Sequence, residues 1–178
     1  AKSLTRTMVY IPVLMSALVV GITINWMFSQ EYGLVNFIIR SLGGTALEWS
    51  LNPRLATFVI AFASVWASIG FNMILYIGGI NSISNDLYEA ATIDGASGVQ
   101  AFFRITVPML APTTFMVVLL STVNLLKEYA LVQGITQGGP GLSTTFIIQY
   151  IFDKGFNQMQ YGYASAISTV VMIIFALI

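Results

Sequence analysis

The rest of the chain is organised around residues 84–108, SNDLYEAATIDGASGVQAFFRITVP. This polar segment lies between long uncharged runs. Ser84 or Asn85 can cap the start of a helix, because their side chains accept hydrogen bonds from free amide groups. Asp86 and Glu89 follow in the first turns, where carboxylates interact favourably with the positive end of the helix dipole. These residues predict a helix that begins at this point.

The second half of the segment predicts a corner and another short helix. Gly95 is the residue type that ends helices by adopting a left-handed conformation. Ser97, with Gln100 three residues later, resembles a capping box that opens the second helix, which leads to Pro108. Two short helices at an angle, placed between apolar runs, indicate a docking element and not a passive linker.

Composition indicates whether the chain is surrounded by water or by a membrane. Of the 178 residues, 57% are apolar and 8% are charged, whereas a soluble domain usually carries about 25% charged residues. Seven basic and seven acidic residues give zero net charge, so the sequence has no feature of a nucleic-acid-binding protein. Cysteine and histidine are absent, which excludes disulfides, thiolate and imidazole metal sites and histidine-dependent catalytic triads. We therefore expect an all-α polytopic helical membrane protein, in which an enzyme could act only through carboxylates, and these are nearly lacking within the apolar runs.

Four uncharged runs are long enough to cross a bilayer, which needs about 20 apolar residues. The predicted spans cover residues 7–29, 55–78, 106–127 and 160–178. The uncharged run that holds the second span has 31 residues, so we expect its last part, residues 78–83, to be a connector. We expect residues 1–178 to form a single transmembrane domain, truncated at both ends.

Two connectors carry further signals. Residues 31–54 are amphipathic and predict an interfacial or re-entrant helix over Leu34–Ser41, with Trp49 as an anchor in the lipid headgroups. Residues 133–146 are rich in glycine but lack the Gly-Lys-Ser/Thr ending of a phosphate-binding loop, so they predict a tight turn and no nucleotide site. Basic residues are divided almost evenly between the two sides, so the positive-inside rule does not decide the orientation.

Polar side chains form two stripes within the predicted spans. The stripe on the second span, with an aromatic ring beside it, consists of Ser64, Ser68, Asn72 and Phe71. The stripe on the third span consists of Ser121, Asn124 and Glu128. Intramembrane polar groups usually face a bundle interior or a water-filled cavity, so the stripes predict a path for a neutral, hydroxylated ligand such as a sugar. Ordinary helix–helix contact explains the serines somewhat better, whereas Asn124 and Glu128 favour the path.

The spacing of residues 89–108 carries a family resemblance. The pattern that resembles the EAA loop of ABC-importer permease subunits is Glu89-Ala90-Ala91, Gly95 and Ile105-Thr106-Val107-Pro108, with Val107 where the family has leucine. The flanking sequences are also similar to binding-protein-dependent sugar permeases. They are WASIGFNMILYIGGINSIS upstream and TQGGPGLSTTFIIQYIF downstream. Residues 138–144 resemble the maltose-type first permease subunit.

The resemblance implies the permease domain of a type I ABC importer in the cytoplasmic membrane of a prokaryote. The implied ATPase-coupling residues, on a cytoplasmic helix, are Glu89, Ala90, Ala91, Asp94 and Gly95. On the other side, the residues of the loop that would face a solute-binding protein are Gly138, Gly139 and Pro140. The implied partners are a second homologous permease subunit, an ABC ATPase dimer that binds ATP and magnesium, an extracytoplasmic solute-binding protein, the lipid bilayer and a small sugar. The chain itself would hold no cofactor.

Three alternatives to sugar import stay open. The solute could be a polyol, glycerol phosphate or another polar compound, although no Lys or Arg lies within the four runs to meet a phosphate group. An ATP-independent secondary transporter or channel predicts discontinuous half-helices or titratable ion sites at the midplane, which the sequence does not indicate. A purely structural subunit would leave the polar stripes unexplained.

Overall fold

The structure is a computed structural model that describes residues 9–177, and its regular elements in that range are all helical, which confirms the all-α class. After a helical segment over residues 9–14, the helices are α2 (Ala17–Met27), α3 (Leu34–Ser41), α4 (Pro53–Asn81), α5 (Asn85–Ile93), α6 (Gly98–Ala101), α7 (Val107–Met109), α8 (Ala111–Leu126), α9 (Ala130–Ile135), α10 (Ile147–Phe152) and α11 (Tyr161–Leu177). Two π-helical segments follow α6 and α10, namely η1 (Phe102–Thr106) and η2 (Asp153–Asn157).

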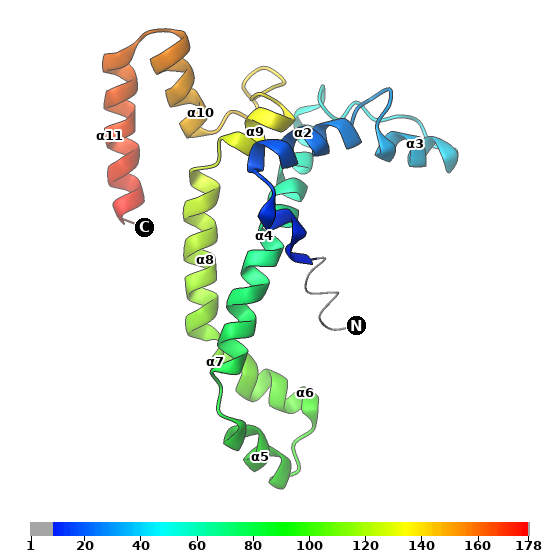
Figure 1. The fold of residues 1–178 in the computed structure, drawn as a ribbon, viewed down its shortest axis with the longest axis vertical. Helices are drawn as coiled ribbons and strands as arrows, with labels where there is room; N and C mark the ends of the chain where they lie inside the picture. The colour runs from blue at the N-terminus through cyan, green and yellow to red at the C-terminus, as the bar shows by residue number, and fades with distance from the viewer. Residues whose placement is uncertain (1–8, 178) are drawn as a thin grey trace.

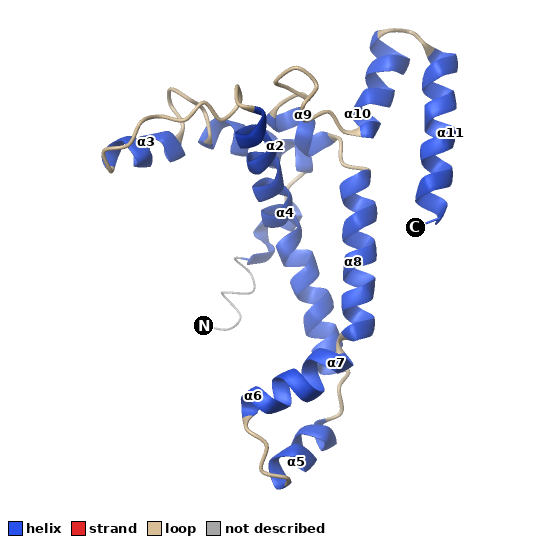
Figure 2. Ribbon diagram, turned by 180° about the vertical axis from the view of Figure 1, so that it is seen from behind, coloured by secondary structure: helices blue, strands red, loops and turns tan. Residues whose placement is uncertain are grey.

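The helices form an elongated molecule with two different ends (Figure 1). Helices α4 and α8 run side by side along its length, α2, α3 and α9 lie across one end, and α5 and α6 lie at the other. Helices α10 and α11 form a pair beside α8, as the view from behind also shows (Figure 2). The polar segment 84–108 and the glycine-rich loop after α9 therefore lie at opposite ends of the molecule.

Helix α4 is the one described helix that is by itself long and apolar enough to cross a membrane. Its 29 residues give a length of about 43 Å, which exceeds a hydrocarbon core of about 30 Å. The helix begins at Pro53, and the side chain of the N-cap Asn52 accepts a hydrogen bond from the Arg54 amide at 3.0 Å.

The C-terminal end of α4 differs from the sequence-based expectation. The helix continues to Asn81, through most of the segment 78–83 that we expected to be a connector. The physical reason is packing, because a Cβ atom at Gly79 would lie 2.5 Å from Oγ1 of Thr113 on α8. Glycine at this position allows two helices to approach closely and does not end the first one.

The third predicted span is bent. Its two parts, Gly98–Met109 and Ala111–Leu126, are together apolar enough to form one broken span, but their axes meet at 58°. Pro108 and Pro112 lie on either side of the bend, and neither has an amide hydrogen to continue the helical hydrogen-bond ladder. The straight part of the span therefore starts at Ala111 and not at residue 106.

The first predicted span, residues 7–29, is interrupted, and its residues 7 and 8 lie outside the described residues. The helical conformation is interrupted at residues 15–16. Helix α2 begins after Ser16, whose side chain accepts a hydrogen bond from the Val19 amide at 3.3 Å. Helices α2 and α11, with 11 and 17 residues, are apolar but shorter than a full span. The spans over residues 7–29 and 160–178, the last residue of which is also not described, stay predictions.

The core lies where α2, α4 and α9 meet. Val20, Leu131 and Val132 are buried there. Helices α2 and α9 cross at two glycines, since a Cβ atom on Gly21 would lie 2.7 Å from the Leu131 carbonyl oxygen and one on Gly134 would lie 2.9 Å from the Gly21 Cα. The contact between the two backbones therefore requires glycine on both helices.

The connector that holds α3 is folded around Asn36, which is completely buried. Asn36 Nδ2 donates to the carbonyl oxygens of Gln30 at 3.1 Å and Leu47 at 2.9 Å, and Oδ1 accepts from the Leu47 amide and the Trp49 indole, both at 3.0 Å. The Trp49 ring also meets Phe28 edge-on, with 5.0 Å between centroids. Helix α3 forms as predicted, but Trp49 is buried in the protein and is not the headgroup anchor that we expected.

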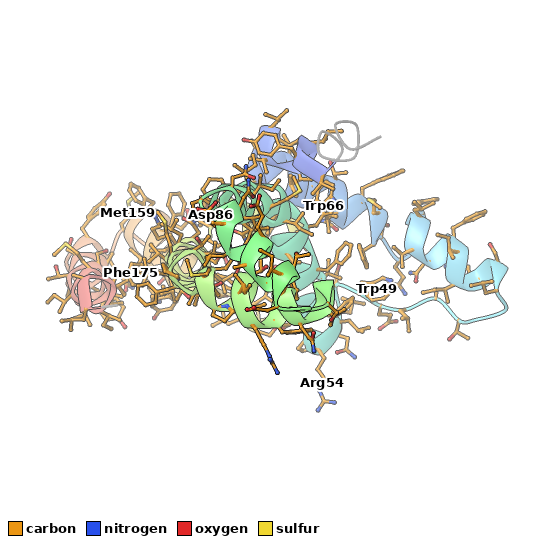
Figure 3. All side chains as sticks on the ribbon, turned by 90° about the horizontal axis from the view of Figure 1, so that it is seen from below. Trp49, Arg54, Trp66, Asp86, Met159 and Phe175 are labelled. Carbon is orange, nitrogen blue, oxygen red and sulfur yellow. The ribbon has the colours of Figure 1, made fainter. Side chains whose placement is uncertain are left out.

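Much of the apolar surface is exposed. Figure 3 shows the molecule viewed along its long axis, from the end that carries Asp86. In this view α11, with Phe175, lies on one side of the molecule and α3 lies on the other. In the most apolar window of α4 only 22% of the residues are buried, and Trp66 on this helix is 36% exposed. Apolar surface of this extent is typical of a chain that meets a bilayer or other subunits.

Candidate functional site

Helix α5 begins at a cap that the sequence predicted. Ser84 Oγ accepts a hydrogen bond from the Asp86 amide at 3.3 Å, so Ser84 and not Asn85 is the N-cap. Asp86 lies in the first turn, where the helix dipole favours its carboxylate. The start of this helix is therefore determined by residues next to one another in the sequence.

The end of α5 is a Schellman motif. The Ala96 amide donates to the Ala91 carbonyl at 2.9 Å and the Gly95 amide donates to the Thr92 carbonyl at 3.1 Å, with Asp94 as the C-cap. Gly95 has a φ of 75°, in the left-handed region that favours glycine. The glycine corner that the sequence predicted is confirmed.

The second helix opens with the predicted capping box. The Ser97 amide donates to Gln100 Oε1 at 2.8 Å, and the Gln100 amide donates to Ser97 Oγ at 3.3 Å. Helix α6 then continues through η1 into α7. The corner between α5 and α6 thus has hydrogen-bonded caps on both sides, which fix its angle.

The five predicted coupling residues lie on α5 and at its end. Glu89, Ala90, Asp94 and Gly95 are exposed, and Ala91 is half-buried. An open hollow of about 390 Å³ on this helix is lined by Asn85, Tyr88, Glu89, Thr92 and Ile93. Small side chains, a free carboxylate and an apolar Ile93 in the open make a surface on which another protein can dock.

A single side-chain hydrogen bond, within residues 9–177, joins α5 to the bent span. The hydroxyl groups of Tyr88 and Thr106 are 2.8 Å apart. Thr106 is 7% exposed and ends η1, immediately before α7. Sequence reasoning missed this pair, because no local pattern links a tyrosine to a threonine 18 residues further on. The bond connects the exposed helix directly to the bend at Pro108.

The two polar stripes line one cavity. It lies between α4 and α8, next to the first residues of α2 and α9, and has a volume of about 760 Å³. All seven residues of the predicted path line it: Ser64, Ser68, Phe71, Asn72, Ser121, Asn124 and Glu128. The remaining lining side chains are apolar, with the exception of Lys127.

Two of the path residues also have local roles. Glu128 Oε1 accepts a hydrogen bond from the Leu131 amide at 3.0 Å, so this carboxylate holds the first turn of α9 while it lines the cavity. Ser64 Oγ is buried and has no hydrogen-bond partner among the described residues. A buried hydroxyl without a partner is unfavourable, so the Ser64 hydroxyl gains from any movement that brings a donor or acceptor to it.

Lys127 is the polar cavity residue that sequence reasoning missed. It lies three residues after Asn124, so it shares a helix face with the polar stripe, and this spacing could have indicated it. We expected a neutral ligand because no basic residue lies within the four uncharged runs. The structure corrects this expectation, because Lys127 belongs to the cavity wall.

The glycine-rich loop is an internally bonded turn at the end opposite α5 (Figure 1). Thr144 is buried, and its Oγ1 donates to the Gly139 carbonyl at 2.6 Å and lies 2.8 Å from Thr136 Oγ1. Gly138 has a φ of 91° and is buried, and the Gly139–Pro140 peptide bond is cis. Gly138 therefore does not face outward as we expected, because the loop packs around it, whereas Gly139 and Pro140 are half-buried and partly exposed.

Comparison with known proteins identifies the family. The family described as binding-protein-dependent transport system inner membrane component matches residues 1–178. The chain belongs to this family. The resemblance carried by the Glu89–Pro108 pattern is thereby confirmed, together with the assignment to a multi-pass inner membrane component.

Two relatives in this family are named for the transport of different solutes. The chain is 35% identical over 97% of its length to the trehalose/maltose transport system permease protein MalF of Thermococcus litoralis, of which it covers 58%. It is 31% identical over 97% of its length to the sn-glycerol-3-phosphate transport system permease protein UgpA of Agrobacterium fabrum, of which it covers 59%. The chain spans somewhat less than two thirds of these relatives.

Solved structures agree with the fold of this inner membrane component. A bacterial ABC transporter involved in the import of the acidic polysaccharide alginate superposes with a TM-score of 0.89 over 99% of this chain and 62% of that one, at 25% identity. The alginate transporter in complex with an alginate pentasaccharide-bound periplasmic protein gives a TM-score of 0.85 over 98% of this chain and 62% of that one, at 26% identity.

Proposed function

We propose that this chain is the transmembrane permease subunit of an ATP-binding-cassette importer for a carbohydrate that an extracytoplasmic solute-binding protein delivers. The observation that carries the proposal is the order of three features along the molecule. Helix α5 with its coupling residues lies at one end, the glycine-rich loop lies at the other, and the cavity lined by both polar stripes lies between them.

Helix α5 is suited to dock into a cleft of an ATPase subunit. Ala90 and Ala91 permit close approach, and Glu89 is free to make a charge-assisted hydrogen bond to the partner. The ATPase dimer would bind ATP and magnesium. A movement of α5 would reach the bent span through the bond between Tyr88 and Thr106, and so change access to the cavity.

The cavity supports a carbohydrate as the solute. Its hydroxyl and amide groups, the ring of Phe71 and its apolar side chains match a ligand that has hydroxyl groups on its edge and apolar faces. Its volume of about 760 Å³ lies within the range of about 300–1,000 Å³ that is typical of small-molecule sites. The trehalose/maltose permease MalF and the alginate importer are relatives with such substrates.

A second candidate is an anionic solute such as glycerol phosphate. Lys127 at the cavity wall supplies a positive charge, and UgpA is a relative named for sn-glycerol-3-phosphate transport. A polyol would use the same hydroxyl and amide groups as a sugar. An ATP-independent transporter is less well supported, because it would leave the exposed coupling surface of α5 without a purpose.

The exposed apolar surface supports two further partners, the lipid bilayer and a second homologous permease subunit. Helices α10 and α11 stand beside α8, apart from the α2–α4–α9 core (Figure 1). A second permease that packed against α10 and α11 would cover apolar surface of these helices that would otherwise contact lipid. The complete importer would then hold two permeases, two ATPase subunits and one binding protein.

The test of the coupling role is co-purification of the full-length protein with its ABC ATPase in nanodiscs. We expect wild type to retain the ATPase and Glu89→Lys to lose it, because charge reversal at a desolvated contact costs about 2–5 kcal/mol. The matched control is Glu31→Lys, an exposed charge in the connector before α3. A wild-type protein that binds no ATPase would contradict the proposed function.

The test of the solute is uptake into proteoliposomes by the complete importer, with maltose, trehalose, sorbitol and sn-glycerol 3-phosphate as probes. For a sugar, we expect Asn124→Leu to raise KM about twofold to tenfold, the effect of one lost hydrogen bond, and Lys127→Gln to change KM little. Lys127→Gln would selectively impair uptake of the phosphate ester if the anionic solute is correct. Unchanged kinetics in Asn124→Leu would count against the path.

A further inference from the structure

A second cavity lies at the end of the molecule that carries the glycine-rich loop. It has a volume of about 480 Å³ and is formed by α9, this loop, α10 and η2. It shares no lining residue with the central cavity. The two are nevertheless neighbours, because Glu128 lines the central cavity and the next residue, Tyr129, lines this one.

Amide groups and aromatic rings dominate the wall of this outer cavity. The amide side chains are Gln133, Gln137, Gln149, Asn157 and Gln158, and the rings are Tyr129, Tyr150 and Phe152. The Tyr129 and Phe152 rings are 5.3 Å apart between centroids and tilted at 44°, so they present two adjoining aromatic faces. Such a wall offers both hydrogen bonds and flat apolar contact to a small ring-shaped ligand.

The charged groups of the outer cavity are already engaged. Asp153 accepts hydrogen bonds from Asn157 at 3.0 Å and from Gln158 at 2.8 Å. Lys154 donates to Gln158 Oε1 at 2.8 Å and lies 5.4 Å from the centre of the Tyr150 ring. One carboxylate and one ammonium group cancel, so the wall has no net charge and suits a neutral ligand.

Gln149 is a nearly buried amide in the wall of the outer cavity. The residue is 7% exposed, its Nε2 donates to Gln133 Oε1 at 2.9 Å, and its Oε1 accepts no hydrogen bond from the described part of the chain. A buried acceptor without a donor is unfavourable. Gly138 lies against this amide, since a Cβ atom there would be 3.2 Å from Oε1, so the loop and Gln149 are packed together.

We propose that the outer cavity is a second sugar-binding site, which holds one neutral, hydroxylated ring before the ligand reaches the central cavity. The ring would pack against Tyr129 and Phe152, and its hydroxyl groups would bond to Gln133 and, once the Gln149 amide turns toward the cavity, to its Oε1. The inference rests on the proposed carbohydrate import and adds to it a place where the chain itself first holds the ligand.

Cysteine protection tests the site directly, because the chain has no cysteine of its own. The complete transporter, with cysteine-free partner subunits, is placed in nanodiscs with Gln137→Cys, an exposed residue of the cavity wall. The matched control is Ser143→Cys, which is exposed in the same loop and does not line the cavity. We expect maltose or trehalose, whichever is taken up, to slow thiosulfonate labelling at position 137 about tenfold at ten times its Kd and to leave position 143 unaffected.

A functional measurement supports the labelling result. We expect Gln133→Leu to raise the KM for uptake about threefold to tenfold, as one hydrogen bond is lost, while kcat and ATP hydrolysis stay at their wild-type values. Gln160→Leu, an exposed residue outside the cavity wall, should have the wild-type KM.

Three outcomes would overturn the proposal. Sugar uptake without protection at position 137 and with a wild-type KM in Gln133→Leu would refute the outer site and leave carbohydrate import intact. A Gln137→Cys thiol that is unreactive in the sugar-free transporter would mean that a partner subunit fills the cavity. Failure of every sugar in the uptake assay would contradict the proposed function, and this site with it.

Discussion

Asn36 uses every hydrogen-bonding position of its side chain. Its two donors and two acceptor positions all have partners in the connector between α2 and α4, and no part of it is exposed. A buried polar group with a complete set of bonds holds one loop conformation, since each bond would be lost in any other. Asn36 therefore determines how α3 and Trp49 are placed.

We expect Asn36→Leu to destabilise this end of the molecule. The substitution removes four hydrogen bonds and leaves the indole N–H of the buried Trp49 without an acceptor, at about 1–3 kcal/mol for that group. Thermal unfolding of the purified protein in detergent, followed by Trp fluorescence, measures the loss. Asn81→Leu, at the exposed end of α4, is the control. Equal melting temperatures for both variants would show that the connector does not depend on Asn36.

We expect Gly95→Ala to weaken the corner after α5, although a Cβ atom there would meet nothing within 4 Å. The cost comes from the left-handed φ of 75°, which an L side chain adopts at about 1–2 kcal/mol. Gly98→Ala is a matched control, because it also lies in open space and adds helix propensity to α6. Hydrogen exchange of the α5 amides should accelerate in Gly95→Ala only, and equal exchange would contradict this reading.

At the scale of elements, helix ends follow local caps, but bends and lengths follow contacts. Helix α4 passes its two consecutive glycines because Gly79 meets Thr113 on α8. The span after the corner bends by 58° between Pro108 and Pro112. Helix α5 is joined to that bend through one hydrogen bond. This gives α5 a direct hydrogen-bonded connection to the span that lines the cavity.

We expect Tyr88→Phe and Thr106→Val each to uncouple ATP hydrolysis from uptake. Either substitution removes the 2.8 Å bond and about 0.5–1.5 kcal/mol of coupling between α5 and the bend. The measurement is the number of ATP molecules hydrolysed per solute taken up in proteoliposomes, which should rise in both variants. The double variant should be no worse than either single one. Additive losses would mean that the two residues act independently, and Thr106→Ser should keep the wild-type ratio.

At the scale of the whole molecule, the two ends have different chemistry. One end carries the exposed carboxylate and small residues of α5, and the other carries the glycine-rich loop and the outer cavity (Figure 1). The central cavity lies between them, against α4 and α8. An importer needs this order, because the solute and the ATPase act from opposite sides of the membrane.

We expect the two ends to be reached from opposite sides of the membrane in cells. Ser143→Cys should react with an impermeant maleimide added outside, whereas Asp86→Cys should react only after the membrane is permeabilised. Both positions are exposed, and the chain has no other cysteine to react. Labelling of both from the same side would contradict the proposed orientation.

The class of the chain and the local structure of its polar segment could be predicted from the order of the residues alone. The apolar composition predicted a helical membrane protein, and Ser84, Gly95 and the Ser97–Gln100 box predicted the helix ends that the structure has. These features depend on residues within a few positions of one another. The Glu89–Pro108 spacing also identified the family for the same reason, since a loop motif is read along the chain.

The contacts between residues far apart in the sequence became known from the three-dimensional fold. It brought two stripes from α4 and α8 to one cavity, added Lys127 to its wall, buried Trp49 on Asn36 and joined Tyr88 to Thr106. The periodicity of a stripe tells which residues share a helix face, but not which way that face turns. That direction depends on close contacts between helices that are far apart in the sequence.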